Sequence, residues 1–163
     1  TIGNDGFPKT RVVLLKQIQN DGFVFYTNYN SEKGQAIMAN SKVCLSFFWP
    51  NLERQIIIKG IAEKVSDAVS DAYFSSRPIG SQLGAMASAQ SEIIISRSFL
   101  EEKLKDLERQ YIDKIIPRPD NWGGILVRPA EYEFWQGRPN RLHDRIRFSD
   151  EKNQKWTINR LSP

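Results

Sequence analysis

The sequence has very little of the two side chains that most often bind metals or form cross-links. Of its 163 residues, one is cysteine (Cys44) and one is histidine (His143). A single cysteine excludes an internal disulfide, so we expect a reducing, cytoplasmic setting. One cysteine and one histidine cannot supply a zinc site, so we expect no metal. Cys44 lies in an apolar run, which predicts a buried small side chain rather than a nucleophile.

The sequence also lacks long apolar runs and glycine-rich loops. Its longest apolar stretches, such as residues 43–49, are far too short to cross a bilayer, so no membrane partner is expected. No glycine-rich phosphate loop follows a predicted strand, which argues against a Rossmann domain or a P-loop. The chain begins with neither a methionine nor a secretory signal. We therefore expect a further N-terminal segment upstream of residue 1.

Charge of one sign is not concentrated anywhere in the sequence. Lys and Arg number 23 against 19 Asp and Glu, which gives a net charge of +4. The basic residues are interspersed with acids, as at 101–106, whereas nucleic-acid-binding proteins usually carry basic blocks. We therefore expect no nucleic-acid partner, and a small phosphorylated ligand fits this balance better.

What the sequence does contain is a series of short strand patterns with a few helices. Strands are predicted at 11–17, 23–27, 42–49, 54–65, 124–128, 131–136, 145–149 and 156–160, with turns at 20–22 and 150–153. Helices are predicted at 31–40, 66–77, 81–88 and 98–111, the first capped by Ser31. Antiparallel strands at short spacing with a few peripheral helices indicate one mainly β domain of the α+β class, a small barrel.

Three segments carry groups suited to a phosphate or a planar ring. Arg11 and Lys16 bracket four apolar residues whose backbone edge could accept a heterocycle. Lys33 lies in the first turn of the predicted 31–40 helix, where backbone amides favour an anion. Tyr73, Arg77 and Ser81 recur every four residues and would converge on a monophosphate. Taken singly, each pattern is also explained by a core strand, a capped helix or ordinary surface residues.

The densest group of functional side chains spans residues 134–145. It combines two aromatic residues, three arginines beyond Gly137 and His143, the one side chain that titrates near neutrality. Such a run can offer a flat surface, cations and a titrating group. A charged turn between two strands explains the same composition, so this run gains meaning only beside the others.

Five segments, taken in order, resemble the pyridoxine/pyridoxamine 5'-phosphate oxidase family. They are Arg-Val-Val-Leu-Leu-Lys at 11–16, Phe-Tyr-Thr at 25–27, Glu-Arg-Gln at 53–55, Tyr-Phe-x-Ser-Arg-Pro-x-x-Ser-Gln at 73–82 and Phe-Trp-Gln-Gly…Arg-Leu-His-Asp-Arg at 134–145. The resemblance implies a single FMN-binding split β-barrel domain over 1–163 and a homodimer with FMN at the subunit interface. It also implies oxidation of pyridoxine or pyridoxamine 5'-phosphate to pyridoxal 5'-phosphate by dioxygen, with release of hydrogen peroxide and, from the amine, ammonia.

The resemblance further implies three sets of site residues. The FMN contacts, some of them from the partner chain, would be Arg11, Val12, Val13, Leu14, Leu15, Lys16, Tyr26, Thr27, Lys33, Gln55, Gln90, Ser91, Trp135 and Arg145. The substrate's phosphate would be held by Lys16, Tyr73, Arg77 and Ser81. Arg141 and His143 would be the catalytic residues that hold the pyridine ring against the flavin.

One position departs from the family pattern. Glu32 stands where the family usually has a basic residue, and a carboxylate beside a phosphate repels it. We therefore expect weaker FMN binding unless Glu32 turns outward.

Two alternative functions remain open. One is a non-catalytic split barrel that binds a flavin or pyridoxal phosphate, although such a protein would not need the substrate clamp. The other is a nucleic-acid-binding barrel, which only the pI of about 9.2 favours. It would bind with an affinity that falls steeply with salt.

Overall fold

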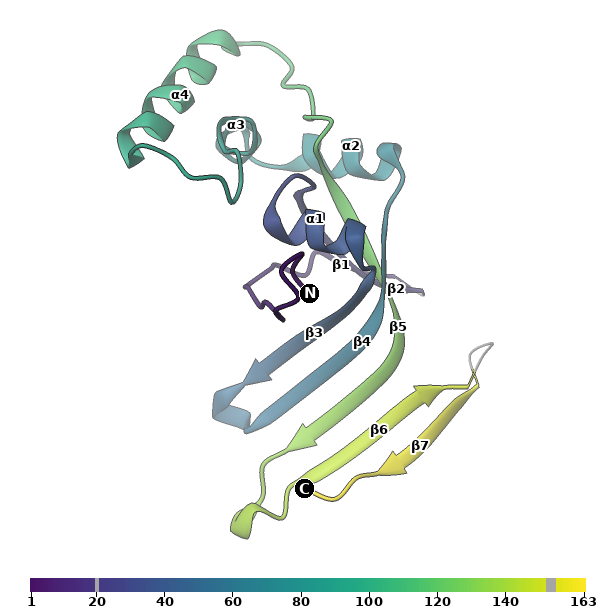
Figure 1. The fold of residues 1–163 in the computed structure, drawn as a ribbon. Coiled ribbons are helices and arrows are strands. Elements are labelled where there is room, and N and C mark those ends of the chain that lie inside the picture. Colours follow the sequence, from purple (N-terminus) through teal and green to yellow (C-terminus); the bar gives the residue numbers. More distant parts are fainter. Residues whose placement is uncertain (20, 152–154) are drawn as a thin grey trace.

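The computed structural model describes residues 1–19, 21–151 and 155–163 (Figure 1). Within these residues, seven strands form one antiparallel sheet in the order β1-β2-β5-β4-β3, to which β6 and β7 are added alongside β5. The strands are β1 (Gln17–Gln19), β2 (Gly22–Asn28), β3 (Lys42–Trp49), β4 (Arg54–Lys64), β5 (Trp122–Gln136), β6 (Asp144–Asp150) and β7 (Trp156–Arg160). The mainly β composition agrees with the sequence prediction.

The central strand, β5, changes partner halfway along its length. Its first half pairs with β2 and its second half with β6, while β4 follows it throughout. At the change of partner Gly60 opposes Pro129, and a β-bulge shifts the register between Lys59 and Gly60. A Cβ atom at Gly60 would collide with the carbonyl oxygen of Arg128, so only glycine allows this approach. The prediction of two strands at 124–128 and 131–136 is therefore wrong, because the bulge lets one strand continue past the proline.

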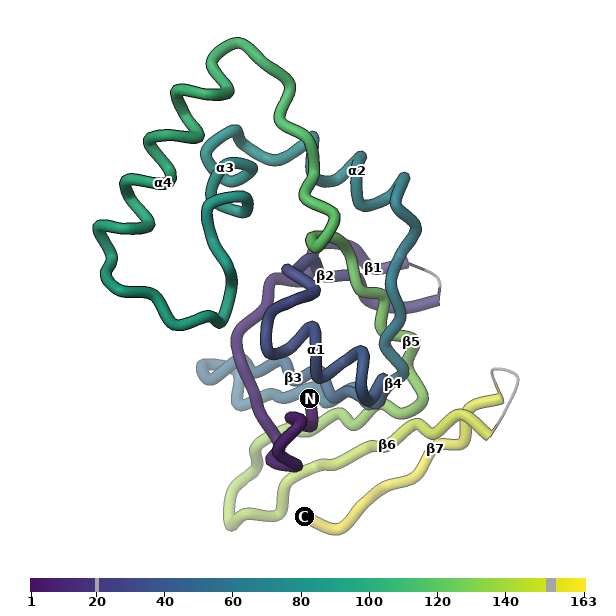
Figure 2. The backbone as a smooth tube through the Cα atoms, turned by 45° about the horizontal axis from the view of Figure 1, so that its top comes forward, coloured from purple at the N-terminus to yellow at the C-terminus, as the bar shows by residue number. Residues whose placement is uncertain are grey.

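Four helices accompany the sheet in the described part of the chain. They are α1 (Glu32–Ala39), α2 (Asp67–Ser76), α3 (Ile79–Ala87) and α4 (Arg97–Gln110). The predicted cap is confirmed, because the Ser31 hydroxyl accepts a hydrogen bond from the N–H of Gly34. In Figures 1 and 2, α2, α3 and α4 gather beyond one end of the sheet, and the β6–β7 hairpin lies at the other end.

Two hydrophobic clusters hold these parts together. The barrel cluster lies between α1 and the sheet and contains Phe25, Ile37, Ala62, Ile125 and Val127. The helical cluster lies where α2, α3 and α4 meet the start of β5 and contains Phe74, Leu83, Ile116 and Trp122. Burial of each large apolar side chain contributes roughly 1.5–3 kcal/mol, so each cluster stabilises one end of the molecule.

Residues 11–16 do not form the predicted strand. The first strand begins only at Gln17, and within 11–16 the N–H of Lys16 donates to the carbonyl oxygen of Val24 at 2.9 Å. Val13 packs on the barrel cluster, whereas Val12 is 92% and Leu14 66% exposed. The β-branched run thus has the composition of a core strand, but only one of its side chains is directed inward.

Cys44 is exposed, so its predicted burial is also wrong. It lies in β3, where successive side chains alternate between the two faces of the sheet. Val43 and Leu45 pack on the barrel cluster, which directs Cys44 outward. Of the predicted turns, Asn20 and the pair at 152–153 lie outside the described residues. No helix among the described residues has the length and apolar character needed to span a membrane.

Candidate functional site

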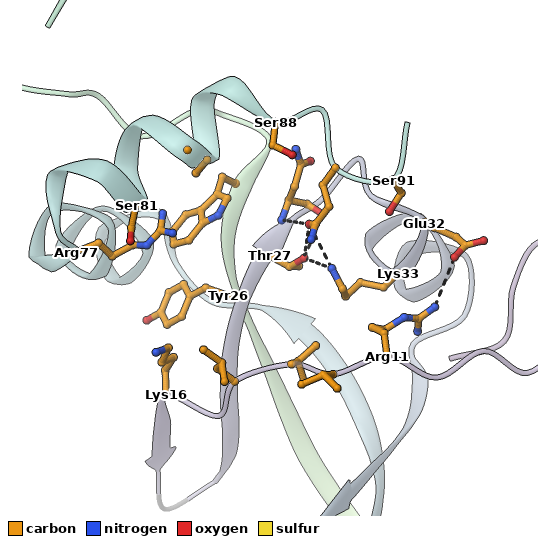
Figure 3. Close-up of a pocket in the computed structure, with 18 of the residues that line it drawn as sticks. Arg11, Lys16, Tyr26, Thr27, Glu32, Lys33, Arg77, Ser81, Ser88 and Ser91 are labelled. Carbon is orange, nitrogen blue, oxygen red and sulfur yellow. Dashed lines mark hydrogen bonds and ion pairs between the residues drawn. The ribbon is translucent and has the colours of Figure 1, made fainter. Parts of the chain in front are cut away.

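A cavity of about 1000 Å³ lies between the barrel cluster and the helical cluster (Figure 3). Its walls come from the segment before β1, from β2, from the start of α1, from the α2–α3 turn and from the loop after α3. Thirteen of the predicted site residues line it: Arg11, Val12, Val13, Leu14, Lys16, Tyr26, Thr27, Lys33, Tyr73, Arg77, Ser81, Gln90 and Ser91. Leu15 is the one residue of the 11–16 run that does not line it.

At one end of the cavity, a buried lysine is held by neutral groups. The ammonium of Lys33 donates to the hydroxyl of Thr27 at 2.5 Å, and to Ser31 Oγ and Gln90 Oε1 at 3.3 Å each. Burial lowers the pKa of Lys33, and the nearby Arg11 charge lowers it further. Because Lys33 lies in the first turn of α1, the helix dipole adds to a positive potential that suits an anionic group.

Glu32, beside this end, is already paired with cations. Its carboxylate accepts a hydrogen bond from the Lys9 ammonium at 2.6 Å and lies 3.8 Å from an Arg11 nitrogen. Lys9 is shared with Asp5 at 3.0 Å. Figure 3 shows Glu32 directed toward Arg11 rather than toward Lys33. The expected repulsion between Glu32 and a bound phosphate stays a prediction. The ion pairs with Lys9 and Arg11 partly neutralise the carboxylate and so weaken that repulsion.

At the other end of the cavity, the predicted clamp residues come together. Tyr73 belongs to α2, Arg77 is the residue that caps the end of α2, and Ser81 lies in the first turns of α3. Lys16 faces them from the opposite wall (Figure 3). Nη1 of Arg77 is buried without a hydrogen-bond partner among the described residues, as is the Tyr26 hydroxyl. Unpaired buried polar atoms are costly, so an anionic ligand at this end would satisfy groups that the chain leaves open.

Besides Leu15, five of the predicted site residues do not line the cavity. Gln55, Trp135, Arg141, His143 and Arg145 lie toward the far end of β5 and the turn that follows it. In the sheet register, Tyr26 opposes Gly124, whereas Trp135 opposes Gln55 and Arg145. At about 3.3 Å per strand residue, Gly124 and Trp135 are on the order of 35 Å apart. Within one chain the two groups of residues therefore form separate clusters.

The second cluster has a well-defined geometry of its own. The ring centroids of Trp135 and His143 lie 4.9 Å apart. Asn140 and Arg141 have φ values of +59° and +60°, a left-handed conformation that is uncommon for residues with a Cβ atom. Asp144 receives hydrogen bonds from Arg138 at 2.7 Å and Arg160 at 2.6 Å, which close the turn. Strain of this kind is typical of functional sites.

Sequence reasoning missed several residues of the cavity wall. Asn28, Ser88 and Trp122 line it beside the predicted residues. Asn28 and Ser88 carry no pattern that separates them from ordinary loop residues. Trp122 is an aromatic residue between a polar loop and Gly123, a position that could have drawn attention to it.

Comparison with known protein families gives two matches along the chain. Residues 1–111 match the family model described as pyridoxamine 5'-phosphate oxidase. Residues 122–163 match the model described as the pyridoxine 5'-phosphate oxidase C-terminal dimerisation region. The chain belongs to the pyridoxamine 5'-phosphate oxidase family. The first match contains the cavity walls before residue 112, and the second contains the cluster around His143.

Individual members of this family are similar over nearly the whole chain. The pyridoxine/pyridoxamine 5'-phosphate oxidase of Flavobacterium johnsoniae is 67% identical over 162 residues, which cover 99% of this chain and 76% of that protein. The protein of the same name from a Nostoc species is 52% identical over 159 residues, covering 98% of this chain and 74% of that protein.

Solved structures confirm the predicted split-barrel fold. PhzG from Burkholderia lata, crystallised with tetrahydrophenazine-1-carboxylic acid, superposes with a TM-score of 0.91 at 27% identity, covering 99% of this chain and 78% of PhzG. A pyridoxamine 5'-phosphate oxidase-related, FMN-binding protein from Nostoc punctiforme gives a TM-score of 0.78 at 16% identity, covering 100% of this chain and 85% of its own. The second likeness concerns the fold alone.

Proposed function

We propose that the protein is an FMN-dependent oxidase that converts pyridoxine or pyridoxamine 5'-phosphate into pyridoxal 5'-phosphate. Dioxygen takes up the electrons and leaves as hydrogen peroxide. With the amine substrate, a water molecule supplies the aldehyde oxygen and ammonia is released. One observation carries the proposal: a single cavity has two separate cationic ends, Arg11 with Lys33 and Lys16 with Arg77. Two phosphate-bearing molecules side by side, a cofactor and a substrate, would use both ends.

The residues at the Lys33 end suit the phosphate of FMN. Lys33 has neutral partners, so its charge is available to an anion, and the first-turn amides of α1 add donors. Residues 12–14 line the cavity without a strand partner in the described chain, so their backbone groups can face the edge of a flavin ring. When bound, FMN supplies the two-electron redox chemistry that no side chain can perform.

The residues at the Arg77 end suit the phosphate of the substrate. Arg77 and Lys16 supply charge, and the hydroxyls of Tyr73 and Ser81 add hydrogen bonds. These contacts with the phosphate fix the distance between the substrate's exocyclic carbon and the flavin, and such positioning supplies much of the rate acceleration. A non-catalytic flavin-binding protein would need only the Lys33 end.

The remaining predicted residues require a second copy of the chain. Arg141, His143, Trp135, Arg145 and Gln55 form the far cluster, which one chain cannot bring to its own cavity. We propose a homodimer in which this cluster completes the partner's site, with Arg141 and His143 orienting the pyridine ring. The match of residues 122–163 to a dimerisation region supports this arrangement. The absence of an internal disulfide supports a cytoplasmic setting.

The experiment is an assay of product formation in air. Purified protein, FMN and pyridoxine 5'-phosphate are mixed, and pyridoxal 5'-phosphate is followed by its absorbance. We expect product that depends on FMN, and little product from pyridoxine, which lacks the phosphate. Binding of FMN without any product from either phosphorylated substrate would instead favour the non-catalytic flavin-binding protein.

A further inference from the structure

Trp122 lines the cavity at the end that contains Tyr73 and Arg77. It is only 7% exposed and begins β5. The guanidinium carbon of Arg77 lies 4.7 Å from its ring centroid. Its ring is nearly parallel to those of Tyr26, at 5.5 Å, and Tyr73, at 6.2 Å, which themselves stack at 3.8 Å. One buried indole therefore touches three residues of the wall.

The position of Trp122 relative to α2 is fixed by a partly buried arginine, Arg118. Arg118, whose side chain is 10% exposed, donates to the carbonyl oxygen of Trp122 at 2.6 Å. Its other nitrogens donate to Asp71 at 2.5 Å and to Asp67 at 2.8 Å, and both aspartates lie in the first two turns of α2. The helix that Arg77 caps is thus tied to the backbone of Trp122, which sets the distance between the indole and the guanidinium.

The side chain of Arg77 depends on this contact because little else holds it. Its carbonyl oxygen is fixed by the amide of Gln82 at 2.8 Å, so the backbone is anchored. Its Nη1 has no hydrogen-bond partner among the described residues, and its guanidinium lies over the faces of Trp122 and Phe74. An aromatic face attracts a guanidinium without using its N–H donors. The donors therefore stay available for the oxygens of a ligand.

We propose that Trp122 is a positioning residue that holds the guanidinium of Arg77, beside the stacked Tyr26 and Tyr73, in the orientation that receives the substrate's phosphate. It reduces the conformational freedom that Arg77 would otherwise lose on binding, so the phosphate binds to a pre-formed site. The inference rests on the proposed function and adds a residue to its substrate end.

The test compares Trp122→Leu with Trp122→Phe in the FMN-loaded enzyme. Loss of the aromatic face should raise KM for pyridoxine 5'-phosphate about tenfold, with kcat and the Kd of FMN changed less than about twofold. Trp122→Phe keeps a ring beneath Arg77 and should restore most of the affinity. In an Arg77→Ala background, Trp122→Leu should add little, because the two residues act on one interaction.

Leu83→Ala is the matched control, since Leu83 belongs to the same helical cluster. It should lower the melting temperature without the selective rise in KM. An unchanged KM in Trp122→Leu would overturn the proposal. A lower kcat, a higher KM and weaker FMN binding together in Trp122→Leu and in Trp122→Phe would also overturn it, because that pattern shows a structural role.

If the wild-type protein forms no product, the proposed function fails by itself. The Kd values of pyridoxal 5'-phosphate and of pyridoxal, measured for the wild type and for Trp122→Leu, then test Trp122 directly. We expect the substitution to weaken binding of the phosphorylated ligand only, and equal weakening of both ligands would overturn the inference.

Discussion

The backbone N–H of Arg138 donates a hydrogen bond to Nδ1 of His143 at 3.1 Å. A ring nitrogen that accepts a hydrogen bond carries no proton, so the neutral imidazole carries its proton on Nε2. His143 therefore presents a hydrogen-bond donor on the side away from Arg138. A donor at that position can bind an oxygen of the substrate ring without taking up a proton.

The first prediction separates this donor role from that of an obligatory base. The amide nitrogen of glutamine can replace Nε2, whereas the shorter asparagine can replace only Nδ1. We expect His143→Gln to retain kcat within about tenfold, the effect of one hydrogen bond, and His143→Asn to lose more. Steady-state kinetics with pyridoxine 5'-phosphate checks this. A loss of about a thousandfold in His143→Gln would show general-base catalysis instead.

Arg141 offers a second prediction, because its backbone is strained. Its φ of +60° is equally unfavourable for alanine, so Arg141→Ala removes the guanidinium without adding backbone strain. We expect turnover to fall by about a hundredfold while the Kd of FMN changes only slightly, since the proposed role of Arg141 is to orient the substrate ring. Turnover and flavin titration are measured on the same preparation. Equal losses of both would indicate that Arg141 is structural.

The third prediction concerns pH and follows from the lowered pKa of Lys33. Burial and Arg11 move this pKa below its ordinary value of 10.5, so the charge is lost at a lower pH than for a free lysine. A bound phosphate needs the charged form. FMN affinity should therefore fall as pH rises through the lowered pKa, and binding there should take up protons. Calorimetric titrations in two buffers measure both quantities.

Lys33→Arg is the control for this pH dependence, because arginine stays charged throughout the alkaline range. Its FMN affinity should not show the same fall. If both proteins lose affinity over the same pH range, the titrating group belongs to the flavin or to another residue, and the assignment to Lys33 is wrong.

The sequence predicts the elements better than it predicts their continuity. The capped helix α1 and strand β3 follow local signals that the structure keeps, since capping and alternation act over a few residues. Where the structure has the single strand β5, the sequence predicts two strands, at 124–128 and 131–136. The bulge opposite Gly60 depends on pairing with β4, a distant segment, so no local pattern shows it.

The candidate site shows the same division. Tyr73, Arg77 and Ser81 converge on one cavity as their spacing predicts. The far cluster around His143 was predicted through family resemblance, and among the described residues of one chain it does not line the cavity. Trp122 was missed because its importance arises from Arg118, Asp67 and Asp71, which position it from elsewhere in the chain.

The fourth prediction concerns Glu32, whose carboxylate lies at the Lys33 end of the cavity, where we propose that FMN binds. Glu32→Gln removes that charge and releases Lys9 and Arg11, so FMN should bind about two- to fivefold tighter, and Glu32→Arg tighter still. The gain should shrink at high salt. Asp5→Asn is the matched control, because Asp5 also pairs with Lys9 but does not line the cavity. An unchanged FMN Kd in Glu32→Arg would refute the repulsion argument.

The last prediction tests whether each site draws on two chains. Arg77 and Arg141 lie in separate clusters of one chain, so a site that uses both must combine the cavity of one copy with the far cluster of the other. Homodimers of Arg77→Ala and of Arg141→Ala should each be nearly inactive at substrate concentrations below the KM of the wild type. A heterodimer of the two, isolated through different affinity tags, contains one doubly altered site and one intact site. Two-fold symmetry then predicts about half of the wild-type activity. If each chain built its own site, both sites of the heterodimer would carry one substitution and no activity would return.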